Sequence, residues 1–60
     1  MNAIEYSAEI KRNMENIDAL RIHILKDWGE KVKDVSDHMI RIRGELYLVE
    51  AMLLRALGNN

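Results

Sequence analysis

Apolar residues recur along the chain at the spacing of three and four positions that predicts amphipathic helices. The first half carries a stripe of such residues, Ile10, Met14, Ile17, Ile24 and Trp28. The second half carries a longer and unbroken stripe, Val32, Val35, Met39, Ile42, Leu46, Val49, Leu53 and Ala56. Arg21 interrupts the first stripe, and we expect Leu20 beside it to cover the gap. The pattern predicts an all-α protein with two helices, the second with a heptad seam.

Gly29 lies between the two stripes and is the strongest candidate for a turn. We expect one helical-hairpin domain over residues 1–60, with a helix at about 3–27, a turn at about 28–31, a helix at about 31–57 and a frayed tail at 58–60. Gly58 would cap the second helix. Two alternatives remain at this point: Asp34 could cap the second helix and lengthen the turn, or one helix could continue through Gly29 at a cost of about 1 kcal/mol.

An antiparallel hairpin with this turn gives the two stripes matching lengths. The facing pairs would be Ile24 with Val35, Ile17 with Ile42, and Ile10 with Val49. Met14, Met39 and Met52 would fill the interior as flexible apolar side chains. Trp28 continues the first stripe, so we expect a lid over the end of the hairpin rather than an anchor for a partner.

The second helix has more apolar surface than a single partner helix can cover. Five such side chains, burying about 100 Å² each, would favour association by roughly 10 kcal/mol per protomer before entropy costs. We therefore expect hairpins to assemble into a homo-oligomeric helical bundle. The expected interface residues are Ile40, Gly44, Leu46, Tyr47, Leu48, Ala51, Leu53, Leu54 and Leu57. An alternative use of this helix is a groove for a helix of another protein, lined by Leu48, Ala51, Met52 and Arg55.

The composition of the chain disfavours several classes of protein. A chain of 60 residues forms at most one domain and buries only about 60% of its surface when it folds alone. It has no cysteine, which excludes disulfides and fits a reducing, cytoplasmic location. A net charge of -1 disfavours binding to duplex nucleic acid. No apolar segment approaches the roughly 20 residues that cross a bilayer, and the polar face lacks the lysines of a membrane-surface helix.

Residues that could support catalysis do not converge in any known motif, so we expect no enzymatic activity and no cofactor. The two histidines form i,i+4 pairs with aspartate, His23 with Asp27 and Asp34 with His38. Both pairs lie near the turn, but their spacing matches no established metal motif. We expect no metal site.

Four cationic residues in the second half form the most suggestive chemical group: Lys33, Arg41, Arg43 and Arg55. Arg41 and Arg43 are two positions apart and cannot share a helix face. In an oligomer, however, arginines of neighbouring protomers can converge on a small anionic ligand, because the guanidinium fork grips phosphate in a bidentate way. Tyr6 or Tyr47 could then stack on a base. The alternative is ordinary salt bridging on a solvated surface.

The last third of the chain, residues 38–57, resembles the final helix of phage helical-hairpin sponges that sequester cyclic oligonucleotide immune signals in anti-CBASS and anti-Thoeris defence. The matching positions are Arg43, Leu46, Leu53, Arg55, Ala56 and Leu57. The resemblance implies a compact oligomer with ligand pockets between protomers. It further implies that Arg43 binds phosphate, that Tyr6 stacks on a base, and that Leu46 and Leu53 remain in the core.

Two functional hypotheses follow. The more specific one is a sponge for cyclic oligonucleotides. The broader one is a protein-binding adaptor or inhibitor, such as a phage inhibitor of a host factor or a small chaperone, that acts through an apolar helix face.

Overall fold

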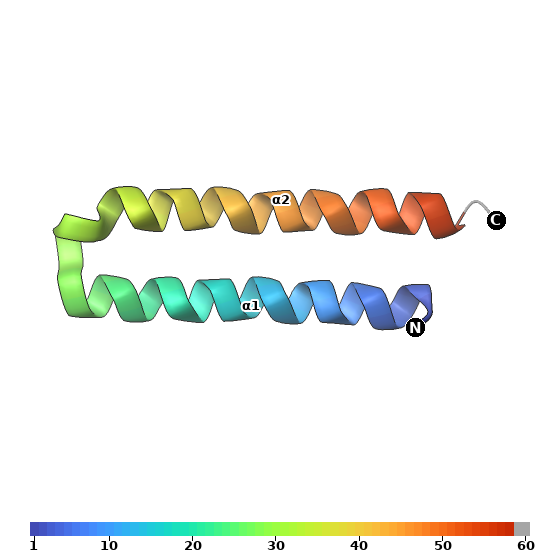
Figure 1. The fold of residues 1–60 in the computed structure, drawn as a ribbon, viewed down its shortest axis with the longest axis horizontal. Helices are drawn as coiled ribbons and strands as arrows, with labels where there is room; N and C mark the ends of the chain where they lie inside the picture. The colour runs from blue at the N-terminus through green and yellow to red at the C-terminus, as the bar shows by residue number, and fades with distance from the viewer. Residues whose placement is uncertain (59–60) are drawn as a thin grey trace.

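The protein is an all-helical antiparallel hairpin in its computed structural model, which describes residues 1–58. Helix α1 spans Ala3–Trp28, a short 3-10 turn η1 spans Gly29–Val32, and helix α2 spans Lys33–Gly58. Figure 1 shows α1 and α2 side by side, with the beginning of α1 and the end of α2 at the same end of the rod. The Cα trace measures 47 × 16 × 8 Å. The predicted all-α class is confirmed.

A reciprocal cap fixes the start of α1. The side chain of Asn2 accepts a hydrogen bond from the backbone N–H of Glu5 at 2.9 Å, and the Glu5 carboxylate accepts one from the N–H of Asn2 at 3.3 Å. Two of the amides that a helix N-terminus leaves without partners are thereby satisfied. The negative charge of Glu5 in the first turn also complements the helix dipole.

The turn depends on Gly29. Its backbone adopts φ 60° and ψ −135°, and its N–H donates to the carbonyl of Leu25. Side chains with a Cβ rarely adopt these angles, so glycine is required for the chain to leave α1 in this direction. The turn occupies Gly29–Val32, and Asp34 lies in the first turn of α2 rather than in a longer loop. The chain is therefore not one continuous helix.

The far end of α2 differs slightly from expectation. Gly58 is the last residue of α2, so it is not part of the tail predicted at 58–60. The rest of that predicted tail, Asn59 and Asn60, lies outside the described residues.

Replacing Gly29 with L-alanine is expected to lower the free energy of unfolding by about 1–3 kcal/mol, because an L residue is strained at these angles. No atom lies within 4 Å of the added methyl group, so strain rather than a clash is the cause. Thermal denaturation followed by circular dichroism checks this. A synthetic chain with D-alanine at position 29 is the matched control, since the mirror-image residue tolerates positive φ. Equal stability of the two alanine chains would contradict the expected strain.

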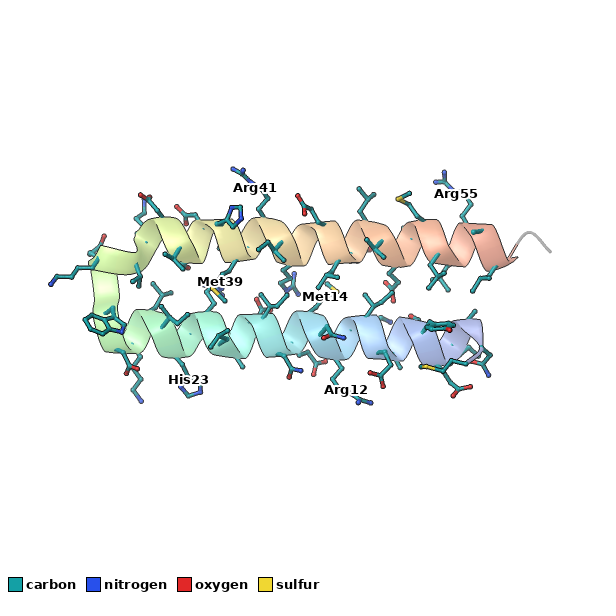
Figure 2. The ribbon with its side chains drawn as sticks, in the orientation of Figure 1. Arg12, Met14, His23, Met39, Arg41 and Arg55 are labelled. Atoms are coloured by element: carbon teal, nitrogen blue, oxygen red, sulfur yellow. The ribbon has the colours of Figure 1, made fainter. Side chains whose placement is uncertain are left out.

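The interior of the hairpin is small. Met14 is 6% exposed and is the one buried apolar side chain among residues 1–58. Figure 2 shows Met14 and Met39 pointing into the space between the helices. Met52 was also expected in the interior, but it is 60% exposed. Other apolar residues that lie along the inside of the hairpin are only partly covered: Ile10, Ile17, Ile24 and Leu25 from α1, Val32 from η1, and Leu46 and Leu53 from α2. Two polar residues are buried among them, Ser36 and Glu50.

The predicted stripe of α2 was right at some positions and wrong at others. Met39, Leu46 and Leu53 lie between the helices as expected. Val35, Ile42 and Val49 were also expected there, but all three are exposed. The residues that follow them, Ser36, Arg43 and Glu50, make the polar contacts with α1 instead. Because neighbouring residues differ by about 100° around a helix, a rotation of α2 by part of this angle explains the difference.

The register between the helices agrees with the predicted pairs. Arg21 contacts Ser36, Asp18 contacts Arg43, and Ser7 contacts Glu50. Each of these contacts lies within two positions of the expected alignment.

Two expectations for α1 were also wrong. Arg21 does not leave a gap for Leu20 to cover, because Arg21 itself lies partly buried against α2 while Leu20 is exposed. Trp28 is 63% exposed and therefore does not form a lid over the end of the hairpin.

Candidate functional site

The first polar contact between the helices surrounds Glu50. This carboxylate is part of the interior, with 8% of the residue exposed. Its Oε2 accepts a short hydrogen bond from the hydroxyl of Ser7. The ammonium group of Lys11 lies 3.9 Å from the same oxygen, but the Lys11 side chain is 65% exposed. An exposed ion pair of this kind stabilises little, so the Ser7 hydroxyl is the main compensation for burying Glu50.

The second and third contacts form a connected network at the middle of the hairpin. Arg43 donates from Nε to Asp18 Oδ2 at 2.6 Å. Asp18 Oδ1 also lies 3.8 Å from Nε of Arg21, whose Nη1 donates to the Ser36 hydroxyl at 3.5 Å. The Arg21 Nε is buried and has no hydrogen-bond partner within residues 1–58. The hairpin thus aligns its helices with polar groups where most hairpins use apolar packing.

The structure does not bring together the residues proposed to bind an anionic ligand and stack on its base, Lys33, Arg41, Arg43 and Tyr6. Arg43 is engaged with Asp18, and Arg41 points away from α1 in Figure 2. Tyr6 lies near the start of α1, at the opposite end of the rod from Lys33 at the start of α2. Tyr6 is also twelve positions, or about 18 Å, along α1 from the Asp18 that holds Arg43. A single hairpin therefore offers no site made of all four residues.

Apolar side chains line α2 on both sides of the polar residues that contact α1. One side, named here the tyrosine flank, consists of Ile40, Gly44, Tyr47, Ala51 and Leu54. The other side, named here the valine flank, consists of Val35, Ile42 and Val49. All eight residues are exposed. Heptad spacing places the two flanks on opposite sides of the contact with α1.

The remaining predicted interface residues divide into two groups. Leu48 and Leu57 are exposed on α2. Leu46 and Leu53 are partly buried and lie on the side of α2 that faces α1. These two leucines therefore belong to the interior of the hairpin, as the family resemblance implies, and are not free for contacts with another chain.

The exposed surface is large for a chain of this size. The solvent-accessible area is 4911 Å², whereas a compact monomeric protein of 7.0 kDa exposes about 4,000 Å². Exposed apolar patches of several hundred Å² mark interaction surfaces on most proteins. The apolar flanks of α2 are thus the candidate functional surface.

Over residues 1–58 the surface has no pocket, and no three potential metal-ligating side chains lie together. His23 points away from α2 in Figure 2, so its pair with Asp27 does not meet Asp34 and His38 across the hairpin. Neither helix, in its described part, is long and apolar enough to cross a membrane.

The fold and this surface define the chain as a two-helix hairpin with an exposed apolar helix. Comparison of the chain with models of protein families, with curated proteins and with solved structures finds no match. The similarity of residues 38–57 to the phage sponges accordingly remains a prediction.

Proposed function

We propose that the protein is a non-enzymatic binding protein that works, in the cytoplasm, as an oligomer of helical hairpins. One observation carries the proposal: the contact between α1 and α2 contains Ser36, Arg43 and Glu50, whereas the valine and tyrosine flanks stay exposed. Met14 is the one buried apolar side chain of residues 1–58, and the other apolar residues of the interior are only partly covered. A hairpin with so little buried apolar surface offsets little of the entropy lost when its chain is ordered. Burial against helices of other chains supplies the missing stabilisation.

Such an assembly would act through helix faces. An exposed amphipathic helix binds other helices through side chains at spacings of three and four residues. The protein-binding adaptor or inhibitor is therefore the function that the geometry supports best. In this role the apolar surface of α2 that remains after assembly would receive a helix of the target protein.

The sponge for cyclic oligonucleotides is the second candidate, and one observation favours it. Within the described chain only Nε of Arg43 is engaged, while the side chain is 45% exposed. Its two terminal nitrogens are therefore available for a phosphate. The nearest aromatic along the same helix is Tyr47, one turn later. We propose Tyr47, in place of Tyr6, as the base-stacking residue of such a site.

Native mass spectrometry of the purified protein tests both candidates. We expect a discrete oligomer at micromolar concentration, and a melting temperature that rises with protein concentration because unfolding is linked to dissociation. The same measurement after incubation with a panel of cyclic di- and trinucleotides distinguishes the functions. A gain of ligand mass that Arg43→Gln abolishes would support the sponge. An unchanged mass would favour the adaptor, and a monomer at all concentrations would refute the assembly.

A further inference from the structure

The tyrosine flank of α2 forms a second heptad seam. Its residues follow at steps of four, three, four and three, and large side chains alternate with small ones: Ile40, Gly44, Tyr47, Ala51 and Leu54. Tyr47 is 64% exposed and Ile40 is 50% exposed, so α1 covers little of this seam. Two seams on one helix allow it to pack against two different helices at once.

We infer that the tyrosine flank binds the same flank of a second copy, with the two α2 helices antiparallel. This inference rests on the proposed assembly and specifies its central contact. A symmetric dimer needs a surface that complements itself. In an antiparallel pair centred on Tyr47, the two Tyr47 residues lie level with each other and Ile40 of each copy lies level with Leu54 of the other. Each Tyr47 side chain then enters the space that Gly44 and Ala51 of the second copy leave on either side of its own Tyr47, as knobs-into-holes packing requires.

The exposed area of the chain agrees with the area that a second copy would bury. The chain exposes about 900 Å² more than a compact monomer of its mass. A standard interface between two proteins buries about 800 Å² on each partner. Burying one flank of α2 and its borders in a dimer therefore brings the exposed area to the value expected of a compact protein.

Charges on the border of the flank favour the antiparallel arrangement. Asp37 precedes the apolar residues and Arg55 follows them, and both are exposed. Reversing one helix about Tyr47 places Asp37 of each chain beside Arg55 of the other. A parallel pair would instead place Asp37 beside Asp37 and Arg55 beside Arg55. Opposite charges across a helix interface set the orientation of the partners.

Gly44 is the reason to place the tyrosine flank, rather than the valine flank, at the centre of the interface between the two copies. Glycine in the middle of a helix reduces helix stability relative to alanine. Nothing within the hairpin requires it, since a Cβ at Gly44 would meet no atom within 4 Å. Close approach of a second helix gives this position a reason to lack a side chain. The valine flank consists of β-branched residues and offers no comparable gap.

Distances between spin labels test the arrangement. The chain has no cysteine, so the variants Asp34→Cys and Glu45→Cys each carry a single label per protomer. In the antiparallel dimer, two labels at position 45 lie about 6 Å apart along the helix axis, and two at position 34 about 39 Å apart. In a parallel dimer both pairs lie close to the interhelical spacing of about 10 Å. Short distances at both positions would overturn the inference.

Two substitutions of equal exposure test which flank is used. Ile40→Glu places a charge on the tyrosine flank, and Val49→Glu places one on the valine flank, where the native side chains are 50% and 48% exposed. We expect Ile40→Glu to raise the dimer dissociation constant at least about 100-fold, because a buried unpaired charge is costly. Val49→Glu should still form dimers. Sedimentation measures the mass, and circular dichroism reports whether each variant is helical.

The failure of this inference can be distinguished from the failure of the proposed function. If Val49→Glu dissociates the protein to monomers while Ile40→Glu remains a dimer, the tyrosine flank is not the central contact. The proposed assembly then stands. If the unmodified protein is a monomer, both are wrong. The Ile40→Glu variant could lose its helical structure as well as its dimers. This result supports the inference if the Val49→Glu variant stays helical and dimeric.

Discussion

Replacing Leu48 and Leu54 together with glutamate is expected to dissociate the assembly and to remove most of its helical circular dichroism at micromolar concentration. Both side chains lie exposed on α2, and in the proposed oligomer both are covered. Their burial contributes about 3 kcal/mol per protomer and therefore about 6 kcal/mol per dimer, which corresponds to a change of about 10,000-fold in the dimer dissociation constant. The helices are then lost as well, because the hairpin alone buries only Met14 among its described apolar residues.

The control for this experiment removes an equally exposed residue from the other helix. Ile22 on α1 is 57% exposed and Leu48 on α2 is 59% exposed. Ile22→Glu should therefore leave both mass and helicity nearly unchanged, while Leu48→Glu alone weakens the oligomer. Analytical ultracentrifugation and circular dichroism on the same samples provide the comparison. A double glutamate variant with the native mass and melting temperature would show that α2 does not mediate assembly.

Replacing Glu50 with leucine is expected to raise the free energy of unfolding by about 1–2 kcal/mol, measured at fixed protein concentration. Glu50 is buried, and its partners are the neutral Ser7 hydroxyl and the largely exposed Lys11. Removing the carboxylate therefore leaves no buried charge behind. Leucine at position 50 would also add apolar contact between the helices.

Removing the partner of Glu50 should have the opposite effect. Ser7→Ala leaves the carboxylate buried without its hydroxyl donor, and we expect the free energy of unfolding to fall by about 1–2 kcal/mol. Alanine at position 7 itself favours the helix by about 0.5 kcal/mol. Comparing Ser7→Ala in the native and Glu50→Leu backgrounds separates the two contributions. Urea denaturation gives all four values, and a stabilising effect of Ser7→Ala in the native background would refute the assigned role of its hydroxyl.

Sequence periodicity was sufficient to predict two helices, the turn at Gly29 and the register of the hairpin. It predicted only part of the face of α2 that meets α1, since Met39, Leu46 and Leu53 lie there as expected. Val35, Ile42 and Val49 repeat every seven residues, and so do Ser36, Arg43 and Glu50. Counting apolar residues selects the first set, whereas the structure uses the second. A helix that is apolar on several sides gives no unique answer from hydrophobicity alone.

Two signals in the sequence could have improved the prediction. Ser7 and Arg21 on the first helix are 14 residues apart, and so are their partners Glu50 and Ser36 on the second, so both pairs align when the chain reverses near Gly29. Asp18 lies within one turn of Arg21 and can reach Arg43 from there. Asn2 followed by Glu5 is a helix-capping pattern. The ligand-binding set was chosen by charge, and charge alone does not reveal that Asp18 engages Arg43.

The order of the charged residues along the contact between α1 and α2 disfavours other alignments of the two helices. If α2 slid by seven residues, or about 10 Å, in one direction, Arg43 would face Arg21 and Glu50 would face Asp18. Sliding by the same distance in the other direction would place Arg43 against Lys11. Like charges meet in either case, so both misalignments are disfavoured. The same charge pairs form, however, whether the two helices belong to one chain or to two. Helix α1 of a second copy presents the same polar residues to α2 as helix α1 of the same chain. These contacts therefore disfavour staggered helices, but they permit two chains to exchange whole helices in a domain-swapped dimer.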